Sequence, residues 1–506
     1  MTEPVLSLTQ HIPALLVLVP LLASAIIPFS PARLRRAGGT VALLANAAAL
    51  ALASALAVET FRLGRVTYNF GGWAPPWGIE YAVDPLAAIM LLLVAFVSFA
   101  AAVYSRAAAG AEIAHEKLPY YHSAGLLLVS GLSGMIITGD VFNLYVFLEI
   151  ASLAGYALIA AGRRRDALVA SFNYLILGTI AATFILLGIG YLYMASGTLN
   201  IADLRERLPH IYHTKTVLTA FAFLMVGFSI KTALFPLHIW LPDAYTYAPS
   251  PASALLAAAG TKVGVYAMLR VTYTVFRPEF NASVVPMKTI LLVLSSAAII
   301  YGAVMAIAQK DIKRMLAWSS VSQIGYIVLG AAIASQYSLT GSLLHMINHA
   351  LMKAALFMCA GLMLISTGAE KISDLRGAAA RMPLTMAAFT AAAVSMTGIP
   401  PTLGFMSKWH IALGAVEAGL WAVVPVVLAG SLLTGIYFWK VIEPAYFAAP
   451  PEGHIPSGRG QAPDTPAPFW AAAPAAALAG LGVLLGLAAW TPAAGAARAA
   501  GELLLK

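Results

Sequence analysis

Residues 228–264 read FSIKTALFPLHIWLPDAYTYAPSPASALLAAAGTKVG, and this stretch decides the fold. It predicts two membrane helices joined by a short proline-rich loop, and each helix carries one lysine among apolar residues, Lys231 and Lys262. A charge in hydrocarbon costs several kcal/mol, so such lysines indicate function. Pro236 interrupts the first helix, and His238 follows it. Such a break is tolerated where backbone groups are buried in protein or meet water, which is typical of an ion path.

The composition is that of a protein embedded in a membrane. Of the 506 residues 60% are hydrophobic and 10% are charged, whereas soluble domains have about 25% charged residues. A large soluble domain is therefore excluded. The one cysteine, Cys359, excludes a disulfide within the chain, an iron–sulfur cluster and a thiolate metal site. The net charge of +9 fits basic cytoplasmic loops better than nucleic-acid binding.

Fourteen apolar runs are long enough to span a bilayer, which takes roughly 17 to 25 residues. They predict an all-α polytopic membrane protein. We expect a short amphipathic helix near residues 203–213 and a loop over 448–468. The apolar runs lie near residues 12–29, 38–58, 83–105, 121–139, 141–162, 167–195, 216–240, 251–276, 287–308, 314–335, 341–366, 383–412, 419–447 and 468–490.

Two of these helices, the seventh and the twelfth, are expected to be broken near a lysine. Pro236 follows Lys231 in one, and Pro400 and Pro401 precede Lys408 in the sequence GIPPTLGFMSKWH of the other. Broken helices at corresponding places in two halves point to inverted repeats in a transporter. We therefore expect N-terminal helices in 1–120, a first five-helix repeat in 121–276, a second, inverted repeat in 287–447, and a loop with a last helix in 448–506.

Basic residues set the expected orientation. With the N-terminus outside, the inside loops hold more of the Lys and Arg residues than the outside loops and tails, which predicts that both termini lie outside. The lysines that remain fall inside predicted helices: Lys231, Lys262, Lys353 and Lys408.

Glu149 lies about two turns into the helix expected over 141–162. An isolated buried carboxylate would stay protonated, whereas a nearby lysine would keep it ionised. Glu149 and Lys231 are therefore expected to pair across two helices. Breaking the pair would leave Lys231 ready to release a proton, which would make the pair a switch. A static buried salt bridge is the alternative.

A second polar face lies on the helix expected over 341–366, which contains SLLHMINHALMKAALF. His345, His349 and Lys353 are spaced i, i+4 and i+8, which places them on one face. Two histidines at this spacing can bind metal, but the next group is a lysine and no carboxylate or cysteine is close, so no metal site is predicted. A face that carries water and protons is favoured, because histidine titrates near neutrality. An interhelical hydrogen-bond seam is the alternative.

These motifs resemble the antiporter-like subunits shared by respiratory complex I, membrane-bound hydrogenases and Mrp-type multisubunit Na+/H+ antiporters. The resemblance covers about residues 70–445 and rests on WLPDAYTYAPSPASALLAAAGTKVGVYAMLR, HMINHALMKAALF and GIPPTLGFMSKW. GGWAPPWGIEYAVDPLAAIM and TGDVFNLYVFLEIASLAGYALI are most similar to the D-type subunit (MrpD) of Mrp-type antiporters. WLPDA and the spacing of the histidines and lysine are more similar to complex I.

The resemblance implies a chain of charged groups along the membrane midplane that moves protons. In that chain Glu149 and Lys231 form a pair and Lys262 connects onward. His349 links the two halves, and Lys408 is the terminal group. Supporting polar positions are His238, His345 and Lys353, and Gln323 stands where some relatives have a histidine.

The function implied is proton translocation by one subunit of a hetero-oligomeric Na+/H+ antiporter, multi-pass in the inner (plasma) membrane of a prokaryote. The alternative is the proton-pumping subunit of a complex I-like NADH/quinone oxidoreductase or a membrane-bound hydrogenase. In either case the partners are other integral membrane subunits, H+, the lipid bilayer and, in an antiporter, Na+. The chain offers no ligands for flavin or iron–sulfur, so we expect no cofactor and no enzyme activity of its own.

Overall fold

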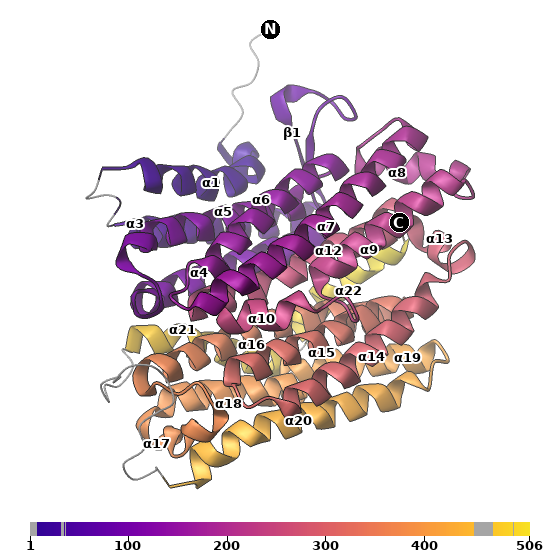
Figure 1. Cartoon of the computed structure of the whole chain (residues 1–506). Coiled ribbons are helices and arrows are strands. Elements are labelled where there is room, and N and C mark those ends of the chain that lie inside the picture. Colours follow the sequence, from indigo (N-terminus) through magenta and orange to yellow (C-terminus); the bar gives the residue numbers. More distant parts are fainter. Residues whose placement is uncertain (1–7, 32–34, 36, 450–468, 489, 506) are drawn as a thin grey trace.

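The computed structural model describes residues 8–31, 35, 37–449, 469–488 and 490–505. The loop expected over 448–468 lies almost wholly outside these residues. Nearly all of the described chain is helical (Figure 1). Within it, 13 helices are long and apolar enough to cross a membrane, and the shorter apolar helix Pro383–Thr397 corresponds to the remaining expected run. The prediction of an all-α polytopic protein is confirmed.

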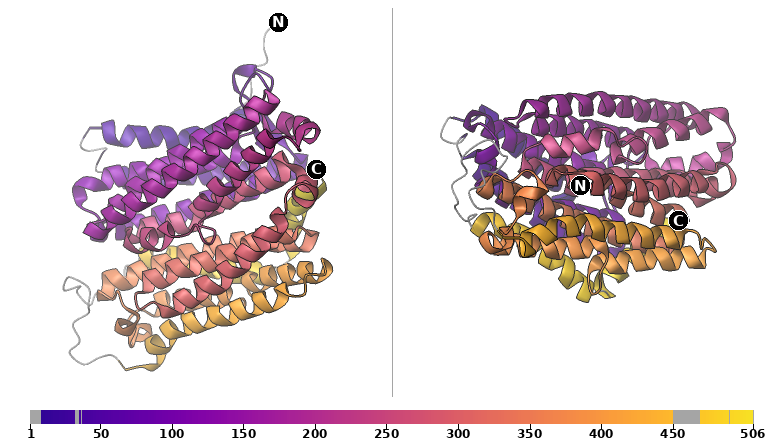
Figure 2. Two further views of the ribbon diagram at one scale, coloured as in Figure 1. Left: turned by 45° about the vertical axis from the view of Figure 1, so that its right-hand side comes forward. Right: turned by 60° about the horizontal axis from the view of Figure 1, so that its bottom comes forward.

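The helices lie side by side, with the first half of the chain forming one layer and the second half another (Figures 1 and 2). The first half contains α1 (Ile12–Phe29), α3 (Gly38–Leu63), α4 (Pro85–Glu112), α5 (Leu118–Ile137), α6 (Val141–Ala160), α7 (Arg165–Ser196), α8 (Ile201–Arg207), α9 (Lys215–Thr232), α10 (Trp240–Tyr247), α11 (Ser250–Leu255), α12 (Thr261–Leu269) and α13 (Arg277–Ser283). The second half contains α14 (Met287–Ala308), α15 (Ile312–Ile333), α16 (Gln336–Thr367), α17 (Ala378–Arg381), α18 (Pro383–Thr397), α19 (Leu403–Glu417), α20 (Val423–Phe447), α21 (Phe469–Leu487) and α22 (Trp490–Leu505).

The last two helices join the halves. Both α21 and α22 pack against α16 of the second half and against α4 of the first. The sequence does not predict α22, since the final apolar run ends at residue 490. Arg498 Nη1 donates to the carbonyl oxygen of Phe61 at 2.7 Å, and Gln336 Nε2 donates to that of Ala497 at 2.7 Å, so α22 contacts elements far apart in sequence.

A small hairpin is the one sheet of the described chain, and the sequence pattern predicts no strand there. Strand β1 (Val66–Asn69) pairs antiparallel with β2 (Glu80–Val83), with Val66 opposite Val83. The hairpin projects from the ends of the helices in Figure 1. Four-residue strands are too short for a clear period-2 pattern, which is why the sequence does not reveal them.

Both expected helix breaks are present. Helix α9 ends at Thr232 because Ala233 adopts a left-handed conformation (φ 57°), and α18 ends at Thr397 because Gly398 does the same (φ 87°). After the first break the structure forms α10, where a plain loop is expected from the sequence. The inverted-repeat relation between the two halves stays a prediction.

The central membrane helix runs over Ser250–Val275 and is nearly all buried. It is not a uniform α-helix, because π-helical segments at Leu256–Gly260 and Arg270–Val275 flank α12. A π-turn inserts an extra residue and disturbs the regular carbonyl pairing, and such bulges recur at functional sites. The first of them lies directly before Lys262.

Candidate functional site

The predicted intramembrane lysines line the interior of the helix bundle. The exposed fraction is 1% for Lys262, 0% for Lys353 and 5% for Lys408, and Lys231 is partly buried. Burying an amine without partners is costly, so the groups that surround each amine determine what it can do.

Lys231 is bonded to a serine. Its Nζ donates to Ser152 Oγ at 2.7 Å, and no direct hydrogen bond or ion pair to Glu149 is formed within the described chain. Glu149 lies one turn before Ser152 on α6, and its Oε1 is buried without a hydrogen-bond partner there. The two charges still interact electrostatically across α6 and α9. Glu149 and Lys231, which were expected to pair, are therefore neighbours, and the Ser152 hydroxyl accepts the hydrogen bond from the amine.

Lys262 is held by the π-helical segment before it. Its Nζ donates to the carbonyl oxygen of Ala257 and lies 3.5 Å from Thr261 Oγ1. No carboxylate of the described residues is among its hydrogen-bond partners. The π-helical segment that precedes Lys262 packs against α16 of the second half.

His345 is fully hydrogen-bonded. Its Nδ1 lies 2.8 Å from Ser407 Oγ on α19, and its Nε2 lies 3.0 Å from Gln323 Oε1 on α15. Gln323 in turn lies 3.4 Å from Thr434 Oγ1 on α20. His345 thus ties α19 and α15 to α16, and Gln323 extends the contact to α20. An interhelical seam of this kind is the alternative that the sequence leaves open.

His349 differs sharply from His345, one turn away. It is 0% exposed, yet neither ring nitrogen has a hydrogen-bond partner among the described residues. The two imidazole rings are stacked with centroids 6.4 Å apart. Asn348 Nδ2 is also buried without a partner. Buried polar atoms are nearly always hydrogen-bonded, to water where no protein group is present, so this position is one where water is expected.

Lys353 completes the polar face of α16. Its Nζ donates to the carbonyl oxygen of Leu316 at 2.6 Å and to Ser319 Oγ at 2.5 Å, both on α15. The face predicted from the spacing of the three residues is therefore present, with three different environments along it. His345 is hydrogen-bonded to side chains, His349 has no hydrogen-bond partner in the described chain, and the Lys353 amine is bonded to neutral oxygens.

Lys408 lies at the end of a helix dipole. From α19 its Nζ reaches the carbonyl oxygens of Met396 and Thr397, both at 3.0 Å, at the C-terminus of the broken helix α18. A cation is stabilised at a helix C-terminus, where unpaired carbonyls carry partial negative charge. The amine also lies 4.5 Å above the centre of the Tyr326 ring, a favourable cation–π contact.

His238 lies apart from this series. It follows the break in the seventh helix and is surrounded by aromatic rings, with Phe235 stacked on it at 5.5 Å and Trp318 edge-on at 5.3 Å. Its Nδ1 is buried without a hydrogen-bond partner in the described chain, and no hydrogen bond there joins it to the lysines.

The partners of the lysines are not evident in the sequence. Ser152, Thr261 and Ser319 each lie beside a lysine amine. Backbone carbonyls at a helix break, in a π-segment and within α15 supply the rest. The sequence contains one signal for these partners: Ser152 follows Glu149 by one helical turn. Within the described residues no group of three or more His, Cys, Asp or Glu side chains is placed to hold a metal ion.

The neutral oxygens that surround the lysine amines have a chemical consequence. An amine bonded only to hydroxyls and carbonyls has no fixed counter-charge to hold its proton. Its protonation therefore responds to charges that move nearby. A row of such amines, together with an unpartnered histidine, can pass protons, whereas it cannot bind a cation that needs anionic oxygen ligands.

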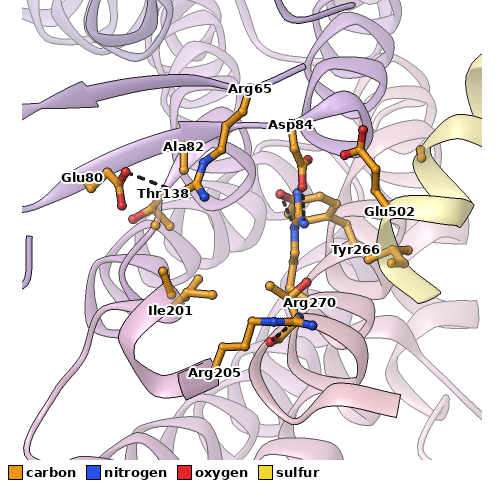
Figure 3. A pocket seen from close by; sticks show the side chains of 15 residues that line it. Arg65, Glu80, Ala82, Asp84, Thr138, Ile201, Arg205, Tyr266, Arg270 and Glu502 are labelled. Atoms are coloured by element: carbon orange, nitrogen blue, oxygen red, sulfur yellow. Dashed lines mark hydrogen bonds and ion pairs between the residues drawn. The ribbon is translucent and has the colours of Figure 1, made fainter. Parts of the chain in front are cut away.

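A small pocket of about 130 Å³ lies near the hairpin, at the end of α12 (Figure 3). Two of its lining residues, Asp84 and Arg270, form a bidentate ion pair, and Arg270 Nε also donates to Tyr266 Oη at 2.9 Å. Arg65 lies 3.4 Å from Glu80 on the hairpin side. Arg205 also lines the pocket, and its buried Nη2 has no hydrogen-bond partner among the described residues.

The chain is similar to known proteins in sequence and in fold. The family model described as NADH:quinone oxidoreductase/Mrp antiporter, TM, matches residues 138–434. The N subunit of an NADH-quinone oxidoreductase from Desulforudis audaxviator is 47% identical over 91% of this chain and 90% of its own length. The D-type subunit of a Na(+)/H(+) antiporter from Bacillus subtilis is 30% identical over 88% of both chains. A chain of the Mrp complex from Dietzia sp. superimposes with a TM-score of 0.88 at 27% identity, covering 99% of this chain and 98% of the other.

Proposed function

Because the chain belongs to the NADH:quinone oxidoreductase/Mrp antiporter family of membrane subunits, we propose that it moves protons through the membrane along its buried lysines and histidines. It does so as one subunit of a multisubunit monovalent cation (Na+)/H+ antiporter. The observation that supports this most directly is the environment of the amines. Lys262 and Lys353 are almost fully buried and bonded only to neutral oxygens. A lysine with a purely structural role has no need of so costly an environment.

Each group has a proposed role. Glu149 and Lys231 gate proton uptake, with Ser152 holding the lysine between transfers. Lys262 passes charge toward the second half, His349 connects the halves through water, and Lys408 releases protons at the far end. His345 and Lys353 support this path, His345 by fixing the helices that line it. His238 is a supporting position with no hydrogen bond to the series.

The architecture fits this role. We propose that residues 121–276 and 287–447 are two inverted repeats, one on each side of the link between Lys262 and His349. We also propose that both termini face outward across the plasma membrane of a prokaryote. The chain acts as a transporter subunit rather than as an enzyme.

A second function is favoured by one observation. The relative that is 47% identical is named a subunit of NADH-quinone oxidoreductase. The same lysines would then belong to a pump driven by electron transfer in partner subunits. Proton movement that depends on an electron donor, and is indifferent to Na+, would establish this second function.

The test is transport by the whole complex in native membrane vesicles. We expect Glu149→Ala and Lys231→Ala to abolish proton movement while the complex still assembles. Lys288→Ala is the matched control, because Lys288 is exposed at the start of α14 and should leave transport unchanged. Normal transport in Lys231→Ala vesicles would refute the proposal.

Purification of the complex from native membranes, followed by mass spectrometry of its subunits, distinguishes the two candidate functions. Small hydrophobic subunits without metalloproteins indicate the antiporter, and Na+-driven proton flux is then the next assay. Iron–sulfur or hydrogenase-like subunits indicate the redox pump.

A further inference from the structure

The last two carbonyl oxygens of α18 have no backbone donor. In a continuing helix the carbonyls of Met396 and Thr397 would accept from the N–H groups four residues on. Those residues are Pro400 and Pro401, which have no N–H, and no other backbone group of the described chain donates to the two oxygens. Lys408 Nζ lies there instead, at 3.0 Å from each oxygen. The double proline therefore creates a place where two carbonyls hold a positive charge.

An aromatic ring forms another side of this place. Tyr326 is fully buried, and its hydroxyl donates to the carbonyl oxygen of Val427 at 3.0 Å, which fixes the ring. Lys408 Nζ lies 4.5 Å from the ring centre. The face of an aromatic ring attracts a cation, most strongly where water is excluded. We call the carbonyls of Met396 and Thr397 together with the Tyr326 ring the carbonyl seat.

The carbonyl seat suits a monovalent cation. Helix C-termini carry partial negative charge, and unwound carbonyls at the ends of half-helices coordinate Na+ in membrane transporters. No carboxylate of the described residues is bonded to Lys408, so the seat offers neutral oxygens and a ring. A divalent ion prefers carboxylate ligands, whereas an alkali cation carries the same charge as an ammonium group.

A capping lysine without such a seat occurs elsewhere in the chain. Lys440 Nζ donates to the carbonyl oxygens of Ile307 and Gln309, at 2.5 and 3.1 Å, at the C-terminus of α14. It is half-buried, and no aromatic ring of the described residues lies over its amine. Lys408 is 5% exposed and lies inside the helix bundle, where a charge is costly. Because the two lysines share a bonding pattern and differ in depth and ring, Lys440 is a matched control.

The first helix break holds no charge at its carbonyls. There the carbonyl oxygen of Ile230 accepts from Trp240 Nε1 at 2.8 Å, a neutral donor. The amine of Lys231 bonds instead to Ser152 on α6. Of the two breaks in the described chain, the second is therefore the one that holds a cation.

Water can complete the shell of a cation in the carbonyl seat. Ser395, next to Met396, donates to Asn348 Oδ1 at 2.7 Å, and Asn348 Nδ2 is buried without a partner in the described chain. Buried polar atoms of this kind are usually satisfied by water. The break also reaches the surface of the chain, since Pro400 and Pro401 are exposed. The seat therefore adjoins both an expected water and the surface.

We propose that the carbonyl seat binds a monovalent alkali cation, Na+, in exchange for the protonated amine of Lys408. The exchange rests on the proposed proton translocation and deepens it. Lys408 gives one proton to water and becomes neutral, its flexible stem turns aside, and one Na+ takes the two carbonyl oxygens. One positive charge leaves the seat as one enters, so its charge stays the same. Na+ and the proton of Lys408 therefore compete for one place.

Three other titratable side chains lie in this region. His345 of α16 is bonded to Ser407, next to Lys408, while Tyr326 of α15 forms the ring and Tyr437 of α20 lies beside it. Helices α18 and α21, which also pack against α19, carry no titratable side chain. Substitution of Lys408 itself separates its proton from theirs.

Binding of radioactive Na+ to the purified complex tests the competition. We expect the wild type to bind Na+ more tightly at alkaline than at acidic pH, because fewer Lys408 amines then carry a proton. Lys408→Met removes the competing charge and should make this binding independent of pH. Lys408→Arg keeps a charge at all pH values and should lose one bound Na+ per copy of the chain. Lys440→Met should match the wild type, and wild-type binding in Lys408→Arg overturns the seat.

The ring gives a second test that leaves Lys408 in place. Tyr326→Leu should weaken the binding of Na+ about tenfold, whereas Tyr326→Phe, which keeps the ring face, should change it little. This pair also decides the question where the Lys408 variants fail to assemble. Equal Na+ affinities in Tyr326→Leu and Tyr326→Phe overturn the seat.

The outcomes separate the two proposals. Na+ binding that is unaltered by Lys408→Arg, together with loss of transport in Lys231→Ala, refutes the seat and keeps the translocation function. Normal transport in Lys231→Ala, together with Na+ binding that Lys408→Arg removes and Lys408→Met frees from pH, keeps the seat and refutes the translocation function.

Discussion

Lys231 Nζ lies 2.7 Å from Ser152 Oγ, one helical turn beyond Glu149 on α6. The amine thus donates to a neutral hydroxyl, and no direct Glu149–Lys231 ion pair is formed within the described chain. In the switch that we propose, the amine leaves this neutral oxygen for the Glu149 carboxylate and returns to it.

Ser152→Ala tests this arrangement. A hydrogen bond to a charged group contributes about 1.5–3 kcal/mol, and about 1.36 kcal/mol is a factor of ten in rate. We expect proton movement to slow about tenfold in vesicles, with normal assembly. Ser171→Ala is the control, because its hydroxyl donates at 2.8 Å to the carbonyl of Tyr156 and contacts no lysine of the described chain. Equal effects of the two substitutions would count against the switch.

His349 should respond to substitution differently from His345. His349→Leu removes a titratable group between Lys262 and Lys353 that has no hydrogen-bond partner among the described residues, and we expect transport to be lost while the complex stays stable. His345→Leu breaks two hydrogen bonds to other helices, so we expect a lower melting temperature as well. Melting of the purified complex and vesicle transport should be measured together. A drop in melting temperature for His349→Leu equal to that for His345→Leu would contradict this division.

The Asp84–Arg270 pair should be structural. Removing one partner of a buried ion pair typically costs about 3–5 kcal/mol, because the other charge stays buried without compensation. We expect Arg270→Met to lower the melting temperature of the complex markedly. The double variant Asp84→Leu with Arg270→Met should recover much of the loss, which a double-mutant cycle would reveal. Additive losses in that cycle would show that the two side chains act separately.

Gly404 is expected to be irreplaceable at the second helix break. A Cβ atom there would lie 1.7 Å from the carbonyl oxygen of Ser395, so Gly404→Ala must push α19 away from α18. We expect the yield of folded, assembled protein to fall sharply in size-exclusion chromatography. Gly190→Ala is the control, because a Cβ atom there meets nothing within 4 Å. Normal yield from Gly404→Ala would show that the break can open.

The membrane fold followed from the sequence, for a simple reason. A span needs a run of apolar residues, and a proline or a buried lysine within such a run stands out against that background. Apolar runs therefore located the spans, and Pro236, Pro400 and Pro401 located the breaks. The hairpin and α10 are too short to leave a clear local pattern, and α22 lies beyond the last apolar run.

What each charged group touches was decided only by the tertiary structure. His345 and His349 have the same spacing signal, yet one is tied to Ser407 and Gln323 and the other has no partner in the described chain. The sequence paired Lys231 with Glu149, whereas the fold placed the Ser152 hydroxyl of α6 at the amine. The sequence by itself determined which residues are costly to bury. Their partners depend on how far each helix slides and rotates against its neighbours, which no local pattern records.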